Sequence, residues 1–208
     1  QSLRDLDTDR IDLYLVHWPD PNTDIRHPME VMVRAQEEGK LGAVGLSNTN
    51  PDDLAKAREI GKVAVIQGEM NLFMNGPRDT LFPHLHDPEI GFMSWGTLAK
   101  GILTGRAKPN RDYDPVDVRS HAPWWTQSDH TPHYATMDRL APVLKGAGHT
   151  GLELALSHLL DYPETSTALC GARTVAQVDG LVCALDNLVP KSVLEEARAI
   201  QQSIFEND

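Results

Sequence analysis

The chain has 208 residues and a net charge of −11, from 19 basic and 30 acidic residues, and 40% of its residues are hydrophobic. This hydrophobic content is ordinary for a soluble globular protein. The charge argues against nucleic acid and anionic membrane surfaces as partners, because both require clustered cations and no run of Lys and Arg is present. No apolar run approaches the ~20 residues that span a bilayer.

Strand-like and helix-like segments alternate along the chain. Short apolar runs predict strands at residues 11–16, 43–47, 63–73, 91–95 and 165–171. Helices are expected at about residues 29–38, 50–61, 81–85, 152–160, 175–185 and 192–205. Residues 108–132 are rich in Pro, Asp and His, and we expect a long loop there.

The helix after the second strand has clear end signals. Asn50 can cap its first turn, Pro51 suits the first position, and Asp52 and Asp53 face the positive end of the helix dipole. Gly61 can end it. This punctuation predicts a helix between residues 50 and 61.

The alternation implies βαβ units and a parallel α/β sheet. Helices on both faces of a continuous apolar sheet suit a doubly wound sheet and a barrel equally well. No GxGxxG motif follows any strand, which argues against a Rossmann dinucleotide site. Periodicity alone leaves both architectures open.

Five motifs resemble, in order, segments of the aldo-keto reductase family. They are SLRDLDTDRIDLYLVHWPDP, GAVGLSN, VIQGEMNLF, GFMSWGTLAKGILTG and CGARTVAQV. The resemblance covers nearly the whole chain and implies a (β/α)8 TIM barrel, here only the part corresponding to strands 4–8. A full barrel typically needs ~250 residues, and the first residue is Gln1. We therefore expect residues 1–208 to form a single, N-terminally truncated aldo-keto reductase domain.

The resemblance makes His17 the catalytic histidine that orients the substrate carbonyl. Its position at the C-terminal end of a strand agrees with this role, because barrel active sites gather at that face. A lone histidine there could also be a core residue. Trp18 is expected to wall the substrate pocket, and packing under a loop is an equally good reading.

Three polar residues at strand ends are implied to bind the nicotinamide carboxamide: Ser47, Asn48 and Gln67. An amide needs both donors and acceptors, and these side chains supply them. Helix capping is the alternative role for Ser47 and Asn48, but Asn50 already serves as a cap. A buried amide such as Gln67 needs a partner, which favours a ligand contact.

Trp95 stands where the family has an aromatic residue that stacks on the nicotinamide ring. A core tryptophan is the alternative. Gly96 replaces the usual serine, so one side-chain bond to the pyrophosphate is lost. Backbone contacts from Gly96 to Leu98 are still expected.

Gly171, Arg173 and Gln177 match the turn that holds the adenosine phosphate. Backbone NH groups at a helix start favour anions, and Arg173 can add a bidentate contact. A solvated surface arginine is the alternative. Gly180 and Leu181 replace the Glu-Asn pair that the family usually has, a departure that bears on the adenine contacts.

Two functions follow from the resemblance. The first is an NADP(H)-dependent oxidoreductase that reduces aldehydes or ketones to alcohols by hydride transfer, as part of a complete aldo-keto reductase. The second is a non-catalytic nucleotide-binding or regulatory module of the same lineage. Of the family's catalytic Asp, Tyr, Lys and His, only the histidine has a match, so this chain alone is expected to be inactive.

The expected partner is a small-molecule carbonyl substrate, and no metal is expected. The pairs His84 and His86, and His130 and His133, have suggestive spacings, but loop histidines explain them better. QSLRDLDTDR is no signal peptide, and two cysteines fit reduced thiols. These features predict a cytoplasmic protein.

Overall fold

The computed structural model describes residues 1–85 and 90–206. The chain divides into two compact units. The first comprises Gln1–Met70, Met74–Trp95 and Tyr162–Leu169, and the second comprises Asn71–Phe73, Gly96–Asp161 and Cys170–Asp208. Among the described residues, no helix combines the length and the hydropathy needed to cross a membrane.

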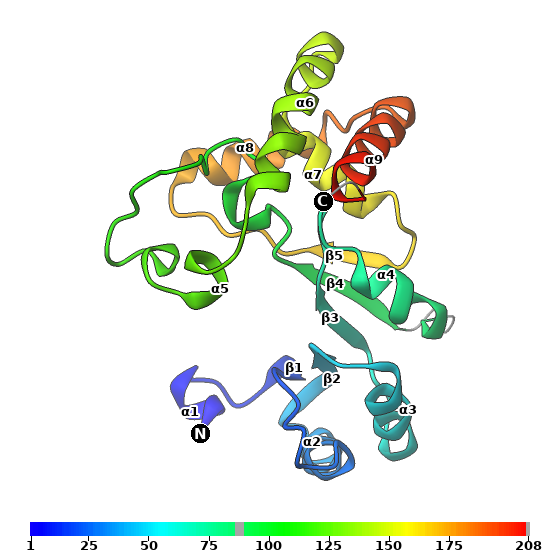
Figure 1. Cartoon of the computed structure of the whole chain (residues 1–208). Coiled ribbons are helices and arrows are strands. Elements are labelled where there is room, and N and C mark those ends of the chain that lie inside the picture. Colours follow the sequence, from blue (N-terminus) through cyan, green and yellow to red (C-terminus); the bar gives the residue numbers. More distant parts are fainter. Residues whose placement is uncertain (86–89, 207–208) are drawn as a thin grey trace. The chain divides into compact units, whose positions relative to one another are not determined.

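The first unit is built on a five-stranded sheet in which each strand runs parallel to its neighbours in sequence order (Figure 1). The strands are β1 (Ile11–Val16), β2 (Leu41–Ser47), β3 (Val65–Glu69), β4 (Gly91–Trp95) and β5 (Thr165–Ala168). The prediction of five parallel strands within an α/β fold is confirmed.

Close packing of β2 against its neighbours depends on a glycine. A Cβ added at Gly45 would lie 2.5 Å from the carbonyl oxygen of Val65 and 2.9 Å from Cδ2 of Leu15. Only a residue without a side chain fits there. The core of this unit includes the fully buried side chains Val44, Leu46, Ile66 and Phe92.

Helix α1 (Ser2–Asp5) precedes β1. The strands of the first unit are connected by α2 (Arg26–Glu37), α3 (Pro51–Ile60), and α4 (Gly76–Thr80) with the 3₁₀ turn η1 (Phe82–His84). Helix α3 begins and ends as predicted. The Asn50 side chain accepts a hydrogen bond from the backbone NH of Asp53 at 2.9 Å, and Gly61 follows the last turn. Helices α2 and α3 pack against each other.

Helix α2 begins three residues before the expected start near Met29. The carboxylate of Asp24 accepts a hydrogen bond from the backbone NH of Arg26 at 3.0 Å, which satisfies a donor of the first turn. Buried Ile25 anchors the same turn. The pattern of apolar residues alone did not predict that the helix begins at these polar residues.

The second unit is mainly helical. It contains η2 (Ala99–Gly101), η3 (Val118–Ser120), α5 (Pro123–Thr126), α6 (Thr131–Ala147), α7 (Gly151–Leu160), α8 (Val175–Leu185) and α9 (Lys191–Phe205). The expected loop at residues 108–132 is mostly irregular, with η3 and α5 as short turns. Helix α6 was not predicted; Pro142 lies inside it, and Gly148, in the left-handed region, ends it.

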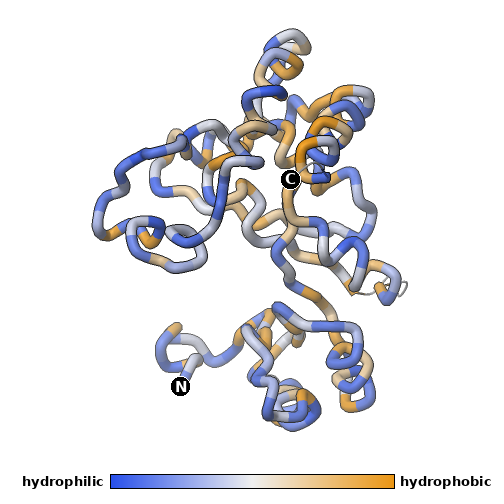
Figure 2. The backbone as a smooth tube through the Cα atoms, viewed as in Figure 1, coloured by the Kyte–Doolittle hydropathy of each residue, from blue (hydrophilic) through white to orange (hydrophobic). Residues whose placement is uncertain are grey.

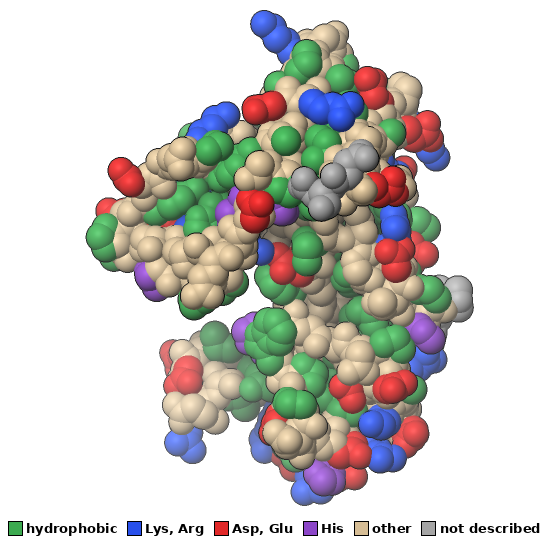
Figure 3. Space-filling model, viewed as in Figure 1, with side chains coloured by type: hydrophobic (Ala, Val, Ile, Leu, Met, Phe, Trp, Pro, Cys, Tyr) green, Lys and Arg blue, Asp and Glu red, His purple; other side chains and the backbone are tan. Residues whose placement is uncertain are grey.

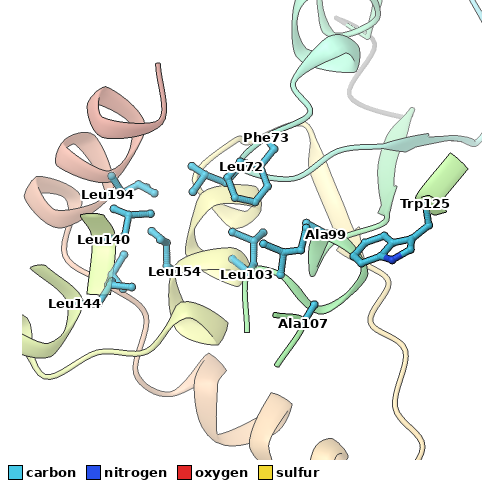
Figure 4. Packing of buried hydrophobic residues seen from close by; sticks show 14 residues of the cluster. Leu72, Phe73, Ala99, Leu103, Ala107, Trp125, Leu140, Leu144, Leu154 and Leu194 are labelled. Atoms are coloured by element: carbon cyan, nitrogen blue, oxygen red, sulfur yellow. The ribbon is translucent and has the colours of Figure 1, made fainter. Parts of the chain in front are cut away.

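Helices α6, α7 and α9 enclose the core of the second unit. Figure 4 shows Leu140, Leu144, Leu154 and Leu194 directed toward one another. Burial of such a side chain stabilises the fold by about 1.5–3 kcal/mol. The cluster comprises Leu72, Phe73, Ala99, Ile102, Leu103, Ala107, Trp125, Leu140, Leu144, Leu154, Ala155, Val189, Leu194 and Ala197.

Helix α9 is amphipathic, and its hydrophobic and hydrophilic residues alternate along the ribbon in Figure 2. Leu194 and Ala197 are buried against the core, whereas Glu195 and Glu196 are exposed. Spacing of three residues places the two buried side chains on one face. This apolar face explains why a helix is stable at this position.

His133 on α6 occupies an aromatic environment within the second unit. Its ring lies 4.7 Å from that of Phe73 and 5.2 Å from that of Phe205, and its Nδ1 atom is buried without a hydrogen-bond partner among the described residues. Burial, followed by the neighbouring charge of His130, lowers its pKa from 6.5 to about 4. The Asp129 carboxylate opposes this shift, and Lys100 adds to it.

We expect acid to destabilise the second unit through His133. A pKa that is lower in the folded state means that the unfolded chain binds the proton more readily, so stability falls as the pH drops from about 6.5 toward 4. Between about pH 7 and 5, protonation of His133 should lower the unfolding free energy by about 1 kcal/mol, a value reduced to allow for partial screening by solvent. The His133→Phe variant should not show this loss. Denaturant unfolding at several pH values measures this loss.

The matched control is His27→Gln, because His27 is exposed on α2. This variant should keep the wild-type dependence of stability on pH. A His133→Phe variant with the same pH dependence as the wild type would contradict the assignment.

Candidate functional site

Polar and aromatic residues collect at the C-terminal ends of the strands of the first unit. His17 directly follows β1, and Ser47 and Trp95 are the last residues of β2 and β4. Gln67, which the sequence placed at the end of its strand, is instead the middle residue of β3. Ser47 pairs with Gln67 in the register of β2 and β3. Because parallel strands end at the same edge, their terminal side chains are neighbours.

The side chain of Asn48 links three of these strand ends. Its Nδ2 donates to the carbonyl oxygen of His17 at 2.9 Å and to Oγ of Ser47 at 3.1 Å. Its Oδ1 accepts a hydrogen bond from Nε1 of Trp95 at 3.0 Å. The backbone of Asn48 is left-handed, with φ of 53°, a region that asparagine tolerates better than most residues.

Ser47 and Gln67 are hydrogen-bonded polar residues on neighbouring strands. Ser47 is fully buried, and its hydroxyl donates to Oε1 of Gln67 at 3.0 Å. The Nε2 of Gln67 donates to the sulfur of Met93 at 3.2 Å, which is a weak acceptor. An amide has two N–H donors, so Gln67 retains donor capacity for a ligand.

Three aromatic rings lie close together at the same strand ends. The rings of Trp18 and Trp95 meet edge to face with centroids 6.5 Å apart, and those of His17 and Trp18 are 6.2 Å apart. Trp18 is 62% exposed and His17 is also exposed. Packing under a loop therefore does not describe Trp18, and a core position does not describe His17.

The structure gives each of the chain's tyrosines a different setting. The hydroxyl of Tyr14 lies 3.0 Å from Oγ of Ser2, and the ring of Tyr162 packs edge to face on Phe82. Tyr113 and Tyr134 belong to the second unit. No hydrogen bond or ring contact with His17 is found for any of them among the described residues.

In the second unit, Gly96 begins a tightly wound turn. Gly96 has φ of 67°, and Ala99 and Lys100 also adopt the left-handed region, with φ of 45° and 55°. Nδ2 of Asn71, which is almost fully buried, donates to the carbonyl oxygen of Gly96 at 3.0 Å. Sequence reasoning missed Asn71, whose position in the apolar segment 63–73 gave no sign of this contact.

The same turn is anchored by Leu98. Its side chain packs against the core of the second unit, and its carbonyl oxygen accepts a hydrogen bond from the backbone NH of Gly101 at 2.9 Å. Non-glycine residues with positive φ are uncommon and store strain, often at ligand sites. The turn therefore holds in place the backbone from Gly96 to Leu98, which the sequence predicts to contact the pyrophosphate.

Gly171, Arg173 and Gln177 surround the start of α8. The backbone NH of Arg173 donates to Oε1 of Gln177 at 2.6 Å, and the NH of Gln177 donates to Oγ1 of Thr174. Gln177 therefore fixes the turn from within. The first-turn NH groups of Val175 and Ala176 have no acceptor among the described residues.

The Arg173 side chain lies beside an acidic residue that sequence reasoning did not single out. Its Nη1 is 3.7 Å from Oδ2 of Asp117, and the side chain is 74% exposed. Asp117 also forms a two-pronged ion pair with Arg119, with contacts of 2.9 and 2.6 Å. These hydrogen bonds hold the pKa of the Asp117 carboxyl well below its usual value.

Of the two histidine pairs, His130 and His133 both lie within the part of the chain that the structure describes. No group of three His, Cys, Asp or Glu side chains there is arranged to hold an ion. Nε2 of His130 lies 3.1 Å from the carbonyl oxygen of Trp125. His86 lies outside the described residues.

The sequence is similar to curated proteins over most of its length. It is 33% identical to the aldo-keto reductase YhdN of Bacillus subtilis over 181 residues, which are 86% of this chain and 55% of that protein. It is 28% identical to the NADH-specific methylglyoxal reductase of Escherichia coli over 188 residues, 89% of this chain and 57% of that protein. The chain thus spans a little over half the length of these relatives.

Solved structures agree with this result. The glycerol dehydrogenase AKR11B4 from Gluconobacter oxydans superposes with a TM-score of 0.82 at 28% identity, covering 96% of this chain and 61% of that one. The aldo-keto reductase AKR11C1 from Bacillus halodurans shares the fold with a TM-score of 0.74 at 22% identity, over 98% and 65% of the two chains. The profile of the Aldo/keto reductase family matches residues 1–202, and this chain therefore belongs to that family.

Proposed function

We propose that the chain forms part of an NADP(H)-dependent oxidoreductase that reduces aldehydes or ketones to alcohols. The observation that carries this proposal is the network of Ser47, Asn48, Gln67 and Trp95 at the strand ends of the first unit. Its donor and acceptor groups match those of a carboxamide. When bound, the dihydronicotinamide supplies the hydride.

The residues fit the nicotinamide end of the cofactor. Among the described residues the acceptor found for Nε2 of Gln67 is a sulfur atom, so this group can donate to the carboxamide oxygen. The oxygens of Ser47 and Asn48 retain lone pairs for the carboxamide NH groups. Trp95 is held through its ring nitrogen, which fixes the plane of the indole and supports stacking on the nicotinamide.

His17 and Trp18 are the residues we assign to the carbonyl substrate. The imidazole of His17 is exposed at the end of β1, where a ring N–H can donate to the carbonyl oxygen and orient it. Trp18 stands edge-on to Trp95 and walls the substrate side. Reduction also requires a proton for the carbonyl oxygen, and among the described residues of the first unit neither Tyr14 nor Tyr162 has a hydrogen bond or ring contact with His17.

The second unit carries the residues that we assign to the phosphates. The backbone from Gly96 to Leu98, which leads into the left-handed residues Ala99 and Lys100, is assigned to the pyrophosphate. Gly171, the free first-turn amides of α8 and the guanidinium of Arg173 are assigned to the adenosine 2′-phosphate. Gln177 supports this turn through its bond to the backbone of Arg173.

We further propose that the five strands correspond to strands 4–8 of a (β/α)8 barrel, within a single domain. The terminal strands β1 and β5 each pair on one side only among the described residues. On α8, Val175, Val178 and Val182 are exposed at helical spacing. Unpaired strand edges and exposed apolar stripes are features that closure of a barrel covers.

We also infer a carbonyl compound as the partner, in a cytoplasmic setting, rather than nucleic acid. Acidic and basic side chains are interspersed on the face shown in Figure 3, where no broad basic area gathers. With a net charge of −11, electrostatic attraction to a phosphate backbone is weak.

The assignment of Arg173 predicts a cofactor-specific effect. Arg173→Ala should weaken NADPH binding about tenfold or more, because a charge-assisted hydrogen bond contributes about 1.5–3 kcal/mol. NADH lacks the 2′-phosphate, so its affinity should change less than about twofold. Calorimetric titration measures both. Arg139→Ala removes the same charge from α6 and serves as the control, and equal losses for the two nucleotides would refute the role of Arg173.

Because neither tyrosine of the first unit contacts His17 among the described residues, we expect the 208-residue chain to bind NADPH without oxidising it in the presence of a reactive aldehyde. Absorbance of the dihydronicotinamide follows turnover. Binding without turnover also fits a nucleotide-binding or regulatory module, the second candidate function. Turnover by this chain would show that the proton donor lies within these residues, and would contradict the proposal.

The uncovered strand edges and the stripe on α8 predict self-association. The isolated chain should be oligomeric in light scattering, and Val178→Lys with Val182→Lys should reduce its apparent mass. Asp179→Lys is the control, because it also adds two units of positive charge to α8 but leaves the valines in place. A monodisperse monomer would contradict the partial-barrel proposal.

A further inference from the structure

We propose that Asp117 is a specificity-determining residue that competes with the adenosine 2′-phosphate for the guanidinium of Arg173. The competition lowers the preference of the chain for nucleotides that carry this phosphate. The proposal rests on the role proposed above for Arg173, and it adds a residue from the segment between β4 and α6.

Asp117 is held in place. Its side chain is only 11% exposed, Oδ1 accepts from Nε and the backbone NH of Arg119, and Oδ2 accepts from Nη2. Arg119 is fixed in turn, because its Nη1 donates to the carbonyl oxygen of Lys100 at 2.6 Å and its guanidinium lies 4.3 Å from the Tyr113 ring. The carboxylate cannot turn away when an anion approaches.

Arg173, by contrast, has an anchored backbone and a loosely held side chain. Gln177 binds its backbone NH, whereas its Nη1 lies 3.7 Å from Oδ2 of Asp117, which is longer than a hydrogen bond. With 74% of the side chain exposed, the guanidinium is accessible to a ligand from solvent. The same group is thus within reach of a protein carboxylate and of a phosphate.

The charges set the direction of the effect. Arg119 and Arg173 carry one positive charge each and Asp117 one negative charge, so the three side chains sum to +1. A phosphate monoester carries about two negative charges, whereas the 2′-hydroxyl of NADH carries none. Neutralising Asp117 releases Arg173 for the phosphate and leaves the hydroxyl ligand unaffected.

The test uses two probes that differ only in the 2′-phosphate, adenosine 2′,5′-bisphosphate and adenosine 5′-monophosphate. Calorimetry of Asp117→Asn should show about fivefold tighter binding of the bisphosphate, in the range expected for release of an exposed ion pair. Binding of the monophosphate should stay within about twofold. In an Arg173→Ala background the gain should vanish.

Two further variants separate the contact from simple charge and from folding. Asp114→Asn changes the net charge equally, and Asp114 accepts from the backbone NH of Val116 rather than pairing with Arg173. It should leave both affinities unchanged. Asp117→Ser removes the charge but keeps an oxygen that can cap η3, and it should reproduce the gain if Asp117→Asn unfolds.

Unchanged bisphosphate affinity in both Asp117 variants would overturn the proposal, as would a gain that persists without Arg173. Failure of the proposed function gives a different result. In that case the wild-type chain binds neither probe, or Arg173→Ala leaves the discrimination between them unchanged. The proposed competition by Asp117 would then also be wrong.

Discussion

The side chain of Asn48 holds together the ends of β1, β2 and β4, and the geometry of the candidate nicotinamide site depends on it. A carbonyl, a hydroxyl and an indole are bonded to one amide, at distances between 2.9 and 3.1 Å. A single amide provides both donor and acceptor groups, so the Asn48 side chain can bond both the backbone of His17 and the ring nitrogen of Trp95. The left-handed backbone of Asn48 turns this amide back over the sheet edge.

A different principle organises the second unit. There, charged groups and strained backbone replace the amide network, with the carboxylate of Asp117 between two guanidiniums and Asn71 bonded to the turn at Gly96. The residues proposed to bind nicotinamide thus rely on neutral hydrogen bonds, and those proposed to bind phosphate rely on charge. Binding at the first should respond little to salt, and binding at the second strongly.

Much of the first unit could be predicted from local sequence. The apolar runs located all five strands, and Asn50 and Gly61 marked the ends of α3, because strand burial and helix capping are set by neighbouring residues. The placement of Ser47 at a strand end followed from the same runs, whereas Gln67 lies in the middle of β3 because that strand continues to Glu69. Their direct hydrogen bond required the strand register, which local patterns do not contain.

Contacts between distant residues account for what was missed. Asp117 and Arg173 are 56 positions apart, and Asn71 and Gly96 are 25 apart, so no spacing rule linked them. Helix α6 was overlooked because Pro142 reads as a break, although buried Leu140 and Leu144 hold the helix in the core. The motif placed Gln177 in the turn expected to hold the adenosine phosphate, and the hydrogen bond from the backbone NH of Arg173 to its Oε1 within that turn was not foreseen.

Ser47, Asn48, Gln67 and Trp95 are proposed to bind nicotinamide at the edge of the sheet. Quenching of tryptophan fluorescence by nicotinamide mononucleotide tests this proposal most directly, with Trp95→Phe compared against Trp124→Phe. Stacking on Trp95 predicts saturable quenching in the wild type and in Trp124→Phe, and its loss in Trp95→Phe. Saturable quenching that survives in Trp95→Phe would contradict the account.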